Sequence, residues 1–281
     1  MSDSSDFMSE YYRNQAASKK YLDALLTLAT PTVHDVVLDV GTGSGTVCFF
    51  LGERINRIYG IDPNRDLIVK RRKEAQELID KREVLPHFNV TFLELAAEDV
   101  KEQFKQSYFD TVVCWGYVHH FRDLDKAMES IRHVCKPEGK LIVFDAFFPE
   151  PIRDFWELAS TIHDPSTVRH HTYFEYMEML RKNSFMPKLI YPFRHSMDLD
   201  KWLDTIKGED EVVANDIRSR LPGKYDAWLE QAQQKGLRQT LREEILNLDE
   251  EKKVFITLRD LGSNRYEFTY DTFVLLATRN E

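Results

Sequence analysis

Cysteine is scarce in this chain of 281 residues, and its placement does not suggest cross-links. The three cysteines, Cys48, Cys114 and Cys135, lie in apolar stretches and lack the spacing of metal ligands. An odd number of such thiols is typical of a reducing compartment and not of a disulfide framework. We therefore expect buried, reduced cysteines, no bound metal and a cytoplasmic protein.

Long apolar runs and an excess of basic charge are also lacking. No run approaches the roughly 20 residues that a membrane span needs, and the acidic N-terminus differs from a signal peptide. The formal net charge is −9, whereas a broad nucleic-acid surface normally needs a basic face. We expect neither a membrane span nor a nucleic-acid partner, and the 42% of hydrophobic residues is ordinary for a globular protein.

A glycine-rich turn follows a short apolar run near the start of the chain. Residues 36–40 (VVLDV) predict a buried parallel strand, and residues 41–45 (GTGSG) let the chain turn sharply beneath a ligand. A second predicted strand ends at Asp62, where a carboxylate can accept hydrogen bonds from both hydroxyls of a ribose. The pattern predicts a nucleoside-binding crevice. The plainer alternative is a tight strand–helix turn without a ligand.

The glycine spacing separates two classes of nucleoside cofactor. A dinucleotide fingerprint needs G-x-G-x-x-G, but Thr46 stands where the third glycine would be. Asp39 precedes the first glycine by two residues, and an acid there suits a cationic amino acid better than a pyrophosphate. The spacing therefore favours S-adenosylmethionine, whose methionine part carries an ammonium group, over a nicotinamide dinucleotide.

Five motifs resemble those of class I S-adenosylmethionine-dependent methyltransferases. They are residues 37–45 (VLDVGTGSG, motif I), 60–63 (GIDP, the acidic second motif), 109–115 (FDTVVCW), 118–121 (VHHF) and 133–141 (HVCKPEGKL). The last three resemble the subgroup near the ubiquinone and menaquinone methyltransferases. The resemblance covers about residues 10–200. It implies an α/β fold, with a Rossmann-like, seven-stranded, mostly parallel sheet and helices on both faces.

Helical spacing and the resemblance together divide the chain into four parts. We expect an N-terminal helical lid at residues 1–30 and the cofactor-binding core at residues 31–196, with a lid segment at 146–183. Residues 197–252 predict a helical insertion, and residues 253–281 predict strands that complete the core sheet. The insertion would serve either as a substrate cap or as a dimerisation element, so a homodimer is one expectation.

The resemblance implies cofactor contacts at the carboxyl ends of the predicted strands. The expected residues are Asp39, Gly41, Thr42, Gly43, Gly45, Asp62, Pro63, Ala97, Glu98, Trp115 and Gly116. The turn would hold the methionine part and Asp62 the ribose. Relatives often carry an acid at the position of Ala96, so contact with the adenine edge falls either to Glu98, beside the Ala97 amide, or to Asp99.

Substrate contact and catalysis have more scattered candidates. They are His119, His163 and His171 for catalysis, and Tyr11, Tyr12 and Arg169 for substrate binding. Each has a structural alternative. His119 and His120 would only pack or orient a loop, the segment 163–171 would be a lid turn in which Asp164 caps a helix, and the two tyrosines would only pack.

These observations predict direct, in-line methyl transfer from S-adenosylmethionine to a small molecule. Aromatic residues in the lid segment hint at a hydrophobic or aromatic acceptor, although aromatics also build cores. Alternatives are a cofactor-binding protein of this fold that is non-catalytic or runs a non-methylating reaction, and an NAD(P)-dependent oxidoreductase, which Thr46 disfavours.

Overall fold

A computed structural model describes residues 19–55, 57–84, 88–206 and 208–280. The chain forms two compact units. The first contains Met1–Asp145, Tyr176–Tyr191 and Phe273–Glu281, and the second contains Ala146–Glu175 and Pro192–Thr272. Each unit is therefore assembled from segments that are distant in the sequence.

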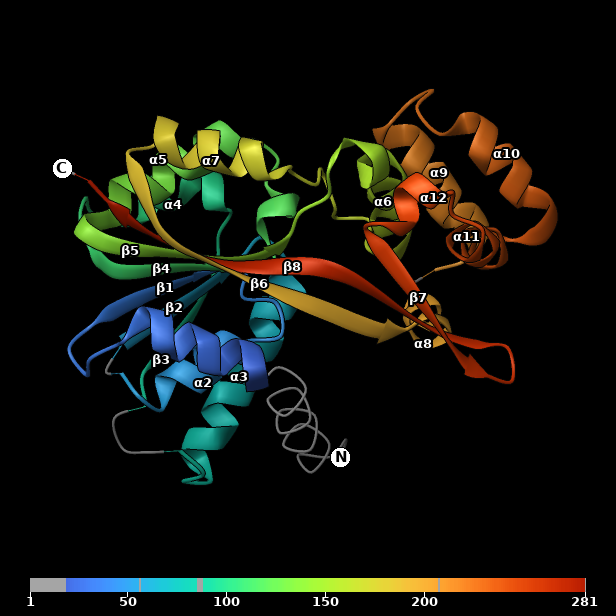
Figure 1. Cartoon of the computed structure of the whole chain (residues 1–281). Coiled ribbons are helices and arrows are strands. Elements are labelled where there is room, and N and C mark those ends of the chain that lie inside the picture. Colours follow the sequence, from blue (N-terminus) through green and yellow to red (C-terminus); the bar gives the residue numbers. More distant parts are fainter. Residues whose placement is uncertain (1–18, 56, 85–87, 207, 281) are drawn as a thin grey trace. The chain divides into compact units, whose positions relative to one another are not determined.

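A sheet in the order β3-β2-β1-β4-β5-β8-β6 organises the strands (Figure 1). Their bounds are β1 (Val36–Val40), β2 (Arg57–Asp62), β3 (Val90–Glu94), β4 (Phe109–Trp115), β5 (Cys135–Ala146), β6 (Phe185–Asp198) and β8 (Arg265–Arg279). Both β6 and β8 have residues in each unit. β1 pairs in parallel with β2 and with β4, so the order of strands reverses at β1. Ligands of open α/β sheets bind outside the carboxyl ends at such a switch point.

The residue types explain why the central strands form. β1 reads VVLDV and is buried in every residue after Val36, and β4 reads FDTVVCW with residues 111–114 buried. Continuous apolar, β-branched runs suit parallel strands that helices cover on both faces. The register pairs Asp39 with Gly60 on β2 and with Val113 on β4. It therefore brings the carboxyl ends of three strands to one edge.

Helices cover both faces of the parallel strands, with α2 and α3 on one face and α4 and α5 on the other (Figure 1). The bounds are α2 (Thr46–Gly52), α3 (Arg65–Asp80), α4 (Val100–Gln103), α5 (Leu124–Val134) and α7 (Tyr173–Lys182), with short 3-10 turns η1 (Ala97–Asp99) and η2 (Val118–His120). The side chains of Asn64 and Asp123 cap α3 and α5 and fix where these helices begin. This arrangement confirms the predicted Rossmann-like fold.

Residues 19–29 form a helix that packs along β5. The Tyr21 ring lies 4.8 Å from the Phe144 ring near the carboxyl end of β5, between ring centroids. At the other end of the helix, Lys140 Nζ donates to the Ala29 carbonyl (2.5 Å). The helix therefore runs antiparallel to β5. A lid over the cofactor stays a prediction, and Tyr11 and Tyr12 lie outside the described residues.

The second unit has a hydrophobic core of its own. Its helices are α6 (Glu150–His163), α8 (Leu199–Asp204), α9 (Asp210–Arg220), α10 (Asp226–Lys235), α11 (Leu237–Leu246) and α12 (Glu250–Lys253). Trp156 on α6 stacks on Trp202 of α8 at 5.7 Å and lies 5.6 Å from the Phe268 ring of β8. A role for the insertion at residues 197–252 as a substrate cap or a dimerisation element stays a prediction. In the described parts of the chain, no helix is long and apolar enough to cross a membrane.

Among the residues that the structure describes, the sheet has eight strands where the sequence predicted seven. The additional strand, β7 (Ile256–Gly262), pairs antiparallel with β8 and lies off the main strand order. Ser263 and Asn264 join the two strands, and both have positive φ angles, of 56° and 59°. Two such residues make the type of turn that matches the twist of a hairpin. The strand count was wrong because this hairpin adds a strand to the sheet.

Candidate functional site

Asp39 is a buried acid near the carboxyl end of β1, with 1% of its surface exposed. Its Oδ2 accepts a hydrogen bond from the Cys48 thiol (3.4 Å), and Thr42 Oγ1 lies 3.4 Å from the same sulfur. Among the described residues, Asp39 Oδ1 has no hydrogen-bond partner. Burial raises the pKa of Asp39 to about 6, opposed by the neighbouring Thr42 and Cys48 side chains. A buried acceptor of this kind points to a polar or cationic ligand.

The glycine turn beside Asp39 presents one open face. Gly41, Gly43 and Gly45 have φ angles of 72°, 46° and 76°, which side chains rarely adopt. The Gly41 amide donates to the Ile61 carbonyl (2.9 Å) and ties the turn to β2. A Cβ on Gly45 would lie 2.7 Å from a ring of α2, so this glycine serves packing. Among the described residues, the atom nearest to a Cβ built on Gly43 would be the Gly41 carbonyl oxygen, at 3.8 Å. This spacing leaves room for a ligand.

Asp62 ends β2 and holds the glycine turn from the other side. It is 6% exposed, and its two oxygens accept from the amides of Gly43 (3.2 Å) and Asn64 (2.8 Å). Pro63 follows and is exposed. Backbone donors therefore hold the carboxylate beside the glycine turn, and its contact with a ribose stays a prediction.

Glu98 lies after β3 in the turn η1, next to the buried Ala97. Its Oε1 accepts hydrogen bonds from the amides of Arg122 (2.9 Å) and Asp123 (3.2 Å). The carboxylate therefore anchors the segment that leads from β4 into α5. Contact of Ala97 or Glu98 with an adenine ring stays a prediction.

Replacing Glu98 with alanine should lower the free energy of unfolding by about 2–3 kcal/mol, because two amides lose a charged acceptor. Asp99→Ala is the matched control. Asp99 pairs with Lys126 (2.8 Å) while about half exposed, and such a pair contributes roughly 0–1 kcal/mol. Urea unfolding of both variants measures the difference. Equal losses in the two variants would contradict the anchoring role.

β4 ends at Trp115, and the loop after it begins at Gly116. Trp115 stacks on Phe144 of β5 with 4.6 Å between ring centroids. Gly116 has a φ of 63°, and no described atom lies within 4 Å of where its Cβ would be.

His119, further along the same loop, is held by Asp145. His119 Nδ1 lies 2.8 Å from Asp145 Oδ1, and Asp145 Oδ2 accepts from the His119 amide (3.4 Å). Asp145 therefore fixes both the ring and the backbone of His119.

Sequence reasoning missed Tyr117, the residue between Gly116 and η2. A Cβ built on Gly41 would lie 1.9 Å from Tyr117 Cγ, so the aromatic ring lies directly on the glycine turn. Burial, and next the carboxylates of Asp62 and Glu98, raise the pKa of Tyr117 above its ordinary range. The signal was an aromatic residue just past a strand that ends in the predicted crevice.

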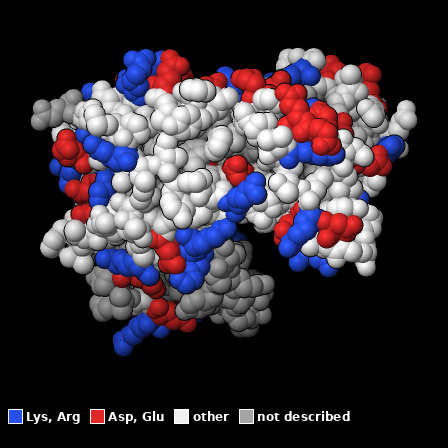
Figure 2. All heavy atoms as spheres, in the orientation of Figure 1, with Lys and Arg blue, Asp and Glu red and all other residues white. Residues whose placement is uncertain are grey.

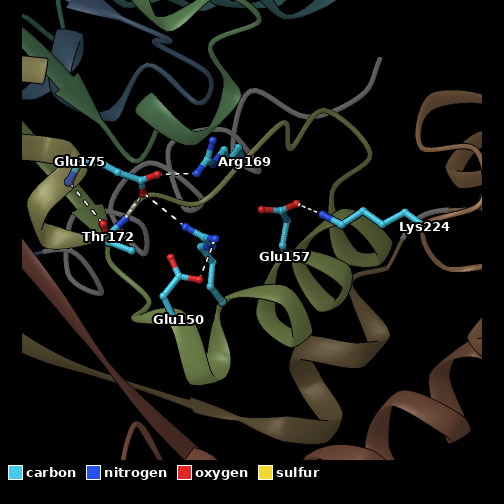
Figure 3. A network of polar contacts seen from close by, with 7 residues as sticks. Glu150, Glu157, Arg169, Thr172, Glu175 and Lys224 are labelled. Carbon is cyan, nitrogen blue, oxygen red and sulfur yellow. Dashed lines mark hydrogen bonds and ion pairs between the residues drawn. The ribbon is translucent and has the colours of Figure 1, made fainter.

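Arg169, a predicted substrate residue, belongs to a polar network within the second unit (Figure 3). It pairs with Glu175 Oε1, and Glu175 Oε2 also accepts from the Thr172 amide (2.7 Å). Arg153 lies 3.6 Å from Glu175 and pairs with Glu150 (2.8 Å). In the structure the Arg169 guanidinium thus neutralises a carboxylate of its own unit.

The two lid histidines that were predicted to be catalytic, His163 and His171, also belong to the second unit. The His163 ring stacks on Trp202 at 4.8 Å, and its Nε2 lies 2.7 Å from Thr205 Oγ1. His171 is buried, with 7% of its surface exposed. The predicted cofactor residues, in contrast, lie together at one edge of the first unit. The predicted roles of His163, His171 and Arg169 stay predictions.

A family model described as a methyltransferase domain matches residues 31–207, which is more than half of the chain. The protein therefore belongs to this family of methyltransferase domains. A Bacillus subtilis relative named as an uncharacterized methyltransferase, YcgJ, is 26% identical over 224 residues, covering 78% of this chain and 75% of the relative. The finer placement near the ubiquinone and menaquinone methyltransferases stays a prediction.

Solved structures of methyltransferases share the fold. The YcgJ structure has a TM-score of 0.69 at 21% identity and covers 92% of this chain and 98% of that one. A Bacillus halodurans protein described as a putative methyltransferase has a TM-score of 0.66 at 19% identity, covering 92% and 99%. Geranyl diphosphate C-methyltransferase from Streptomyces coelicolor has a TM-score of 0.57 at 14% identity, covering 98% and 82%.

Proposed function

We propose that the protein transfers the methyl group of S-adenosylmethionine to a small molecule. The observation that carries the proposal is the buried Oδ1 of Asp39, which has no hydrogen-bond partner among the described residues and belongs to a site whose glycine turn is open at Gly43. An ammonium group would satisfy this oxygen, and the missing side chain of Gly43 leaves space for an amino acid moiety. Membership of the methyltransferase family supports the same ligand.

The remaining cofactor contacts follow from the acids around the turn. Asp62 accepts two backbone amides, and an acid at the end of a parallel strand is the group that would accept hydrogen bonds from the ribose hydroxyls. Glu98 would lie at the adenine end of the cofactor, close to the backbone amides of Arg122 and Asp123, whose hydrogen bonds it accepts. Trp115 and Gly116 would line the crevice beside β5. These residue types fit a nucleoside that carries a cationic amino acid.

The cofactor supplies the electrophile, a methyl group on a sulfonium. The protein then has to bind the acceptor, align its nucleophile with that methyl group and exclude water. A dedicated base is needed only for an acceptor that must lose a proton. The catalytic role of His119, whose ring Asp145 orients, stays a prediction.

A hydrophobic or aromatic acceptor is the substrate class we propose. The structure of the S. coelicolor neighbour contains geranyl diphosphate, in which an apolar isoprenoid chain is joined to a charged diphosphate. The aromatic residues of the lid segment support an apolar acceptor less strongly than the sequence suggested, because Phe148 and Trp156 are buried in the core of the second unit. On the face shown in Figure 2, basic side chains are interspersed with acidic ones, which does not favour a nucleic-acid acceptor.

Calorimetric titration with S-adenosylmethionine, S-adenosylhomocysteine, NAD and NADP tests the cofactor. We expect the two sulfur compounds to bind at micromolar concentration and the dinucleotides to bind at least tenfold more weakly. A preference for a dinucleotide, or binding of none of the four, would overturn the proposal. A screen of small apolar acceptors with methyl-labelled cofactor then tests transfer. Binding without transfer to any acceptor would favour the non-catalytic or non-methylating alternative.

A further inference from the structure

The Tyr117 ring occupies the face of Gly41 that a close-packed ligand would need. The three ring atoms nearest to a Cβ on Gly41 would lie at 1.9, 2.1 and 2.4 Å from it, which places the ring in contact with the glycine backbone. Gly43, two residues on, has no such cover among the described residues. One part of the glycine turn is thus open, and the part nearest to Asp39 is covered.

The other end of the same side chain lies within electrostatic range of two of the proposed cofactor acids. The carboxylates of Asp62 and Glu98 act on the Tyr117 hydroxyl, and burial adds to their effect. These are the acids proposed above for the ribose and the adenine edge. The side chain therefore extends from the methionine end of the proposed cofactor site toward its nucleoside end.

The backbone at Tyr117 is fixed by a hydrogen bond, whereas its side chain makes packing contacts, which a rotation about the side-chain bonds would replace. The Tyr117 carbonyl accepts from the His120 amide (3.0 Å), which fixes the turn η2. The ring packs against His120 and Phe121 at 5.2 and 5.7 Å between centroids. Just before it, no described atom lies within 4 Å of where a Cβ on Gly116 would be. A side-chain rotation can therefore move the ring without rebuilding the loop.

We propose that Tyr117 is a gating residue, whose ring and the cofactor exclude each other on Gly41, so that the ring must rotate away before the cofactor binds. This inference rests on the proposed function. Binding then requires a conformer in which the ring has left the glycine turn. If that conformer is the minor one, the observed association rate and affinity are both reduced by its population.

Removing the ring should therefore speed the association of the cofactor. We expect Tyr117→Ala to raise the association rate constant of S-adenosylhomocysteine about tenfold, which corresponds to a competent conformer populated at about 10%. Stopped-flow fluorescence measures the rate, because Trp115 lies two residues away. Tyr117→Phe keeps the ring and should match the wild type. Tyr117→Leu replaces Tyr117→Ala if the alanine variant does not fold.

Tyr108→Ala is the matched control, since Tyr108 precedes β4 and packs against Tyr59 at the opposite end of the strands. Its association rate should equal that of the wild type. An unchanged or lower rate in Tyr117→Ala would overturn the gate and indicate that the ring is a fixed wall of the site. If the wild type binds neither sulfur compound, the proposed function fails first, so the two failures are distinguishable.

Discussion

Asp39→Asn should weaken binding of S-adenosylmethionine roughly 100-fold at neutral pH and should at the same time stabilise the fold. The binding loss follows from replacing a carboxylate with a neutral amide opposite an ammonium group, since a charged hydrogen bond contributes about 1.5–3 kcal/mol. The Asp39 oxygen that would make this bond is buried and has no partner among the described residues. Few other changes would affect binding so strongly without altering the shape of the site.

The gain in stability follows from the sign of the pKa shift. The pKa of Asp39 is raised in the folded state, from 3.8 to about 6, chiefly by burial. The fold therefore favours the protonated form, and its stability falls as the pH rises from about 4 to about 6. Above that window the penalty is about 3 kcal/mol, at ~1.4 kcal/mol for each tenfold change in proton affinity. Asparagine resembles the protonated acid in shape and charge, so it avoids the penalty.

Calorimetry and urea unfolding at pH 7 measure the two effects on the same samples. Asp110→Asn is the control, because Asp110 on β4 accepts from the Val36 amide at the opposite end of β1 (2.9 Å). It should leave cofactor affinity unchanged. In the wild type, affinity should also fall about tenfold between pH 7 and pH 5 as Asp39 protonates, and Asp39→Asn should show no such fall. Unaltered affinity in Asp39→Asn would remove this acid from the cofactor site.

The first unit could be predicted closely because its signals are local. Residues 36–40 form a strand because they are apolar and β-branched, and the turn at Gly41–Gly45 needs φ angles that glycine provides. The placement of Asp62 follows from the same logic, since an acid at the end of a parallel strand must lie at the ligand edge. In each case the chemistry of a few adjacent residues sufficed.

Contacts between distant segments could not be predicted in the same way. The Tyr117 ring reaches Gly41 only because the register sets β4 beside β1, and an aromatic residue type does not reveal its packing partner. Likewise, helical spacing indicated α6 and α8 but not that His163 would stack on Trp202. The hairpin at Ser263 and Asn264 lacks the Asn-Gly pair that signals such turns most strongly.

Trp156→Ala should lower the free energy of unfolding of the second unit by about 3–5 kcal/mol, the usual cost of removing a large aromatic side chain from a core. Trp156 is 3% exposed and contacts four other aromatic rings of this unit. One is on α8 and two are on β8, at 5.2–5.7 Å between ring centroids, and the fourth is Phe148 at 5.2 Å. The cavity would lie where α6 and α8 meet β8, so neighbouring rings would lose packing on several sides.

Urea unfolding followed by tryptophan fluorescence measures this loss, because Trp202 and Trp228 both report on the second unit. Phe174→Ala is the matched control in the same unit, since Phe174 is 81% exposed and its removal should change stability by less than about 0.5 kcal/mol. A loss below about 1 kcal/mol in Trp156→Ala would contradict a packed core in the second unit. The aromatic residues of the lid segment would then again be candidates for contact with an apolar acceptor, because their burial in this core is the argument against such contact.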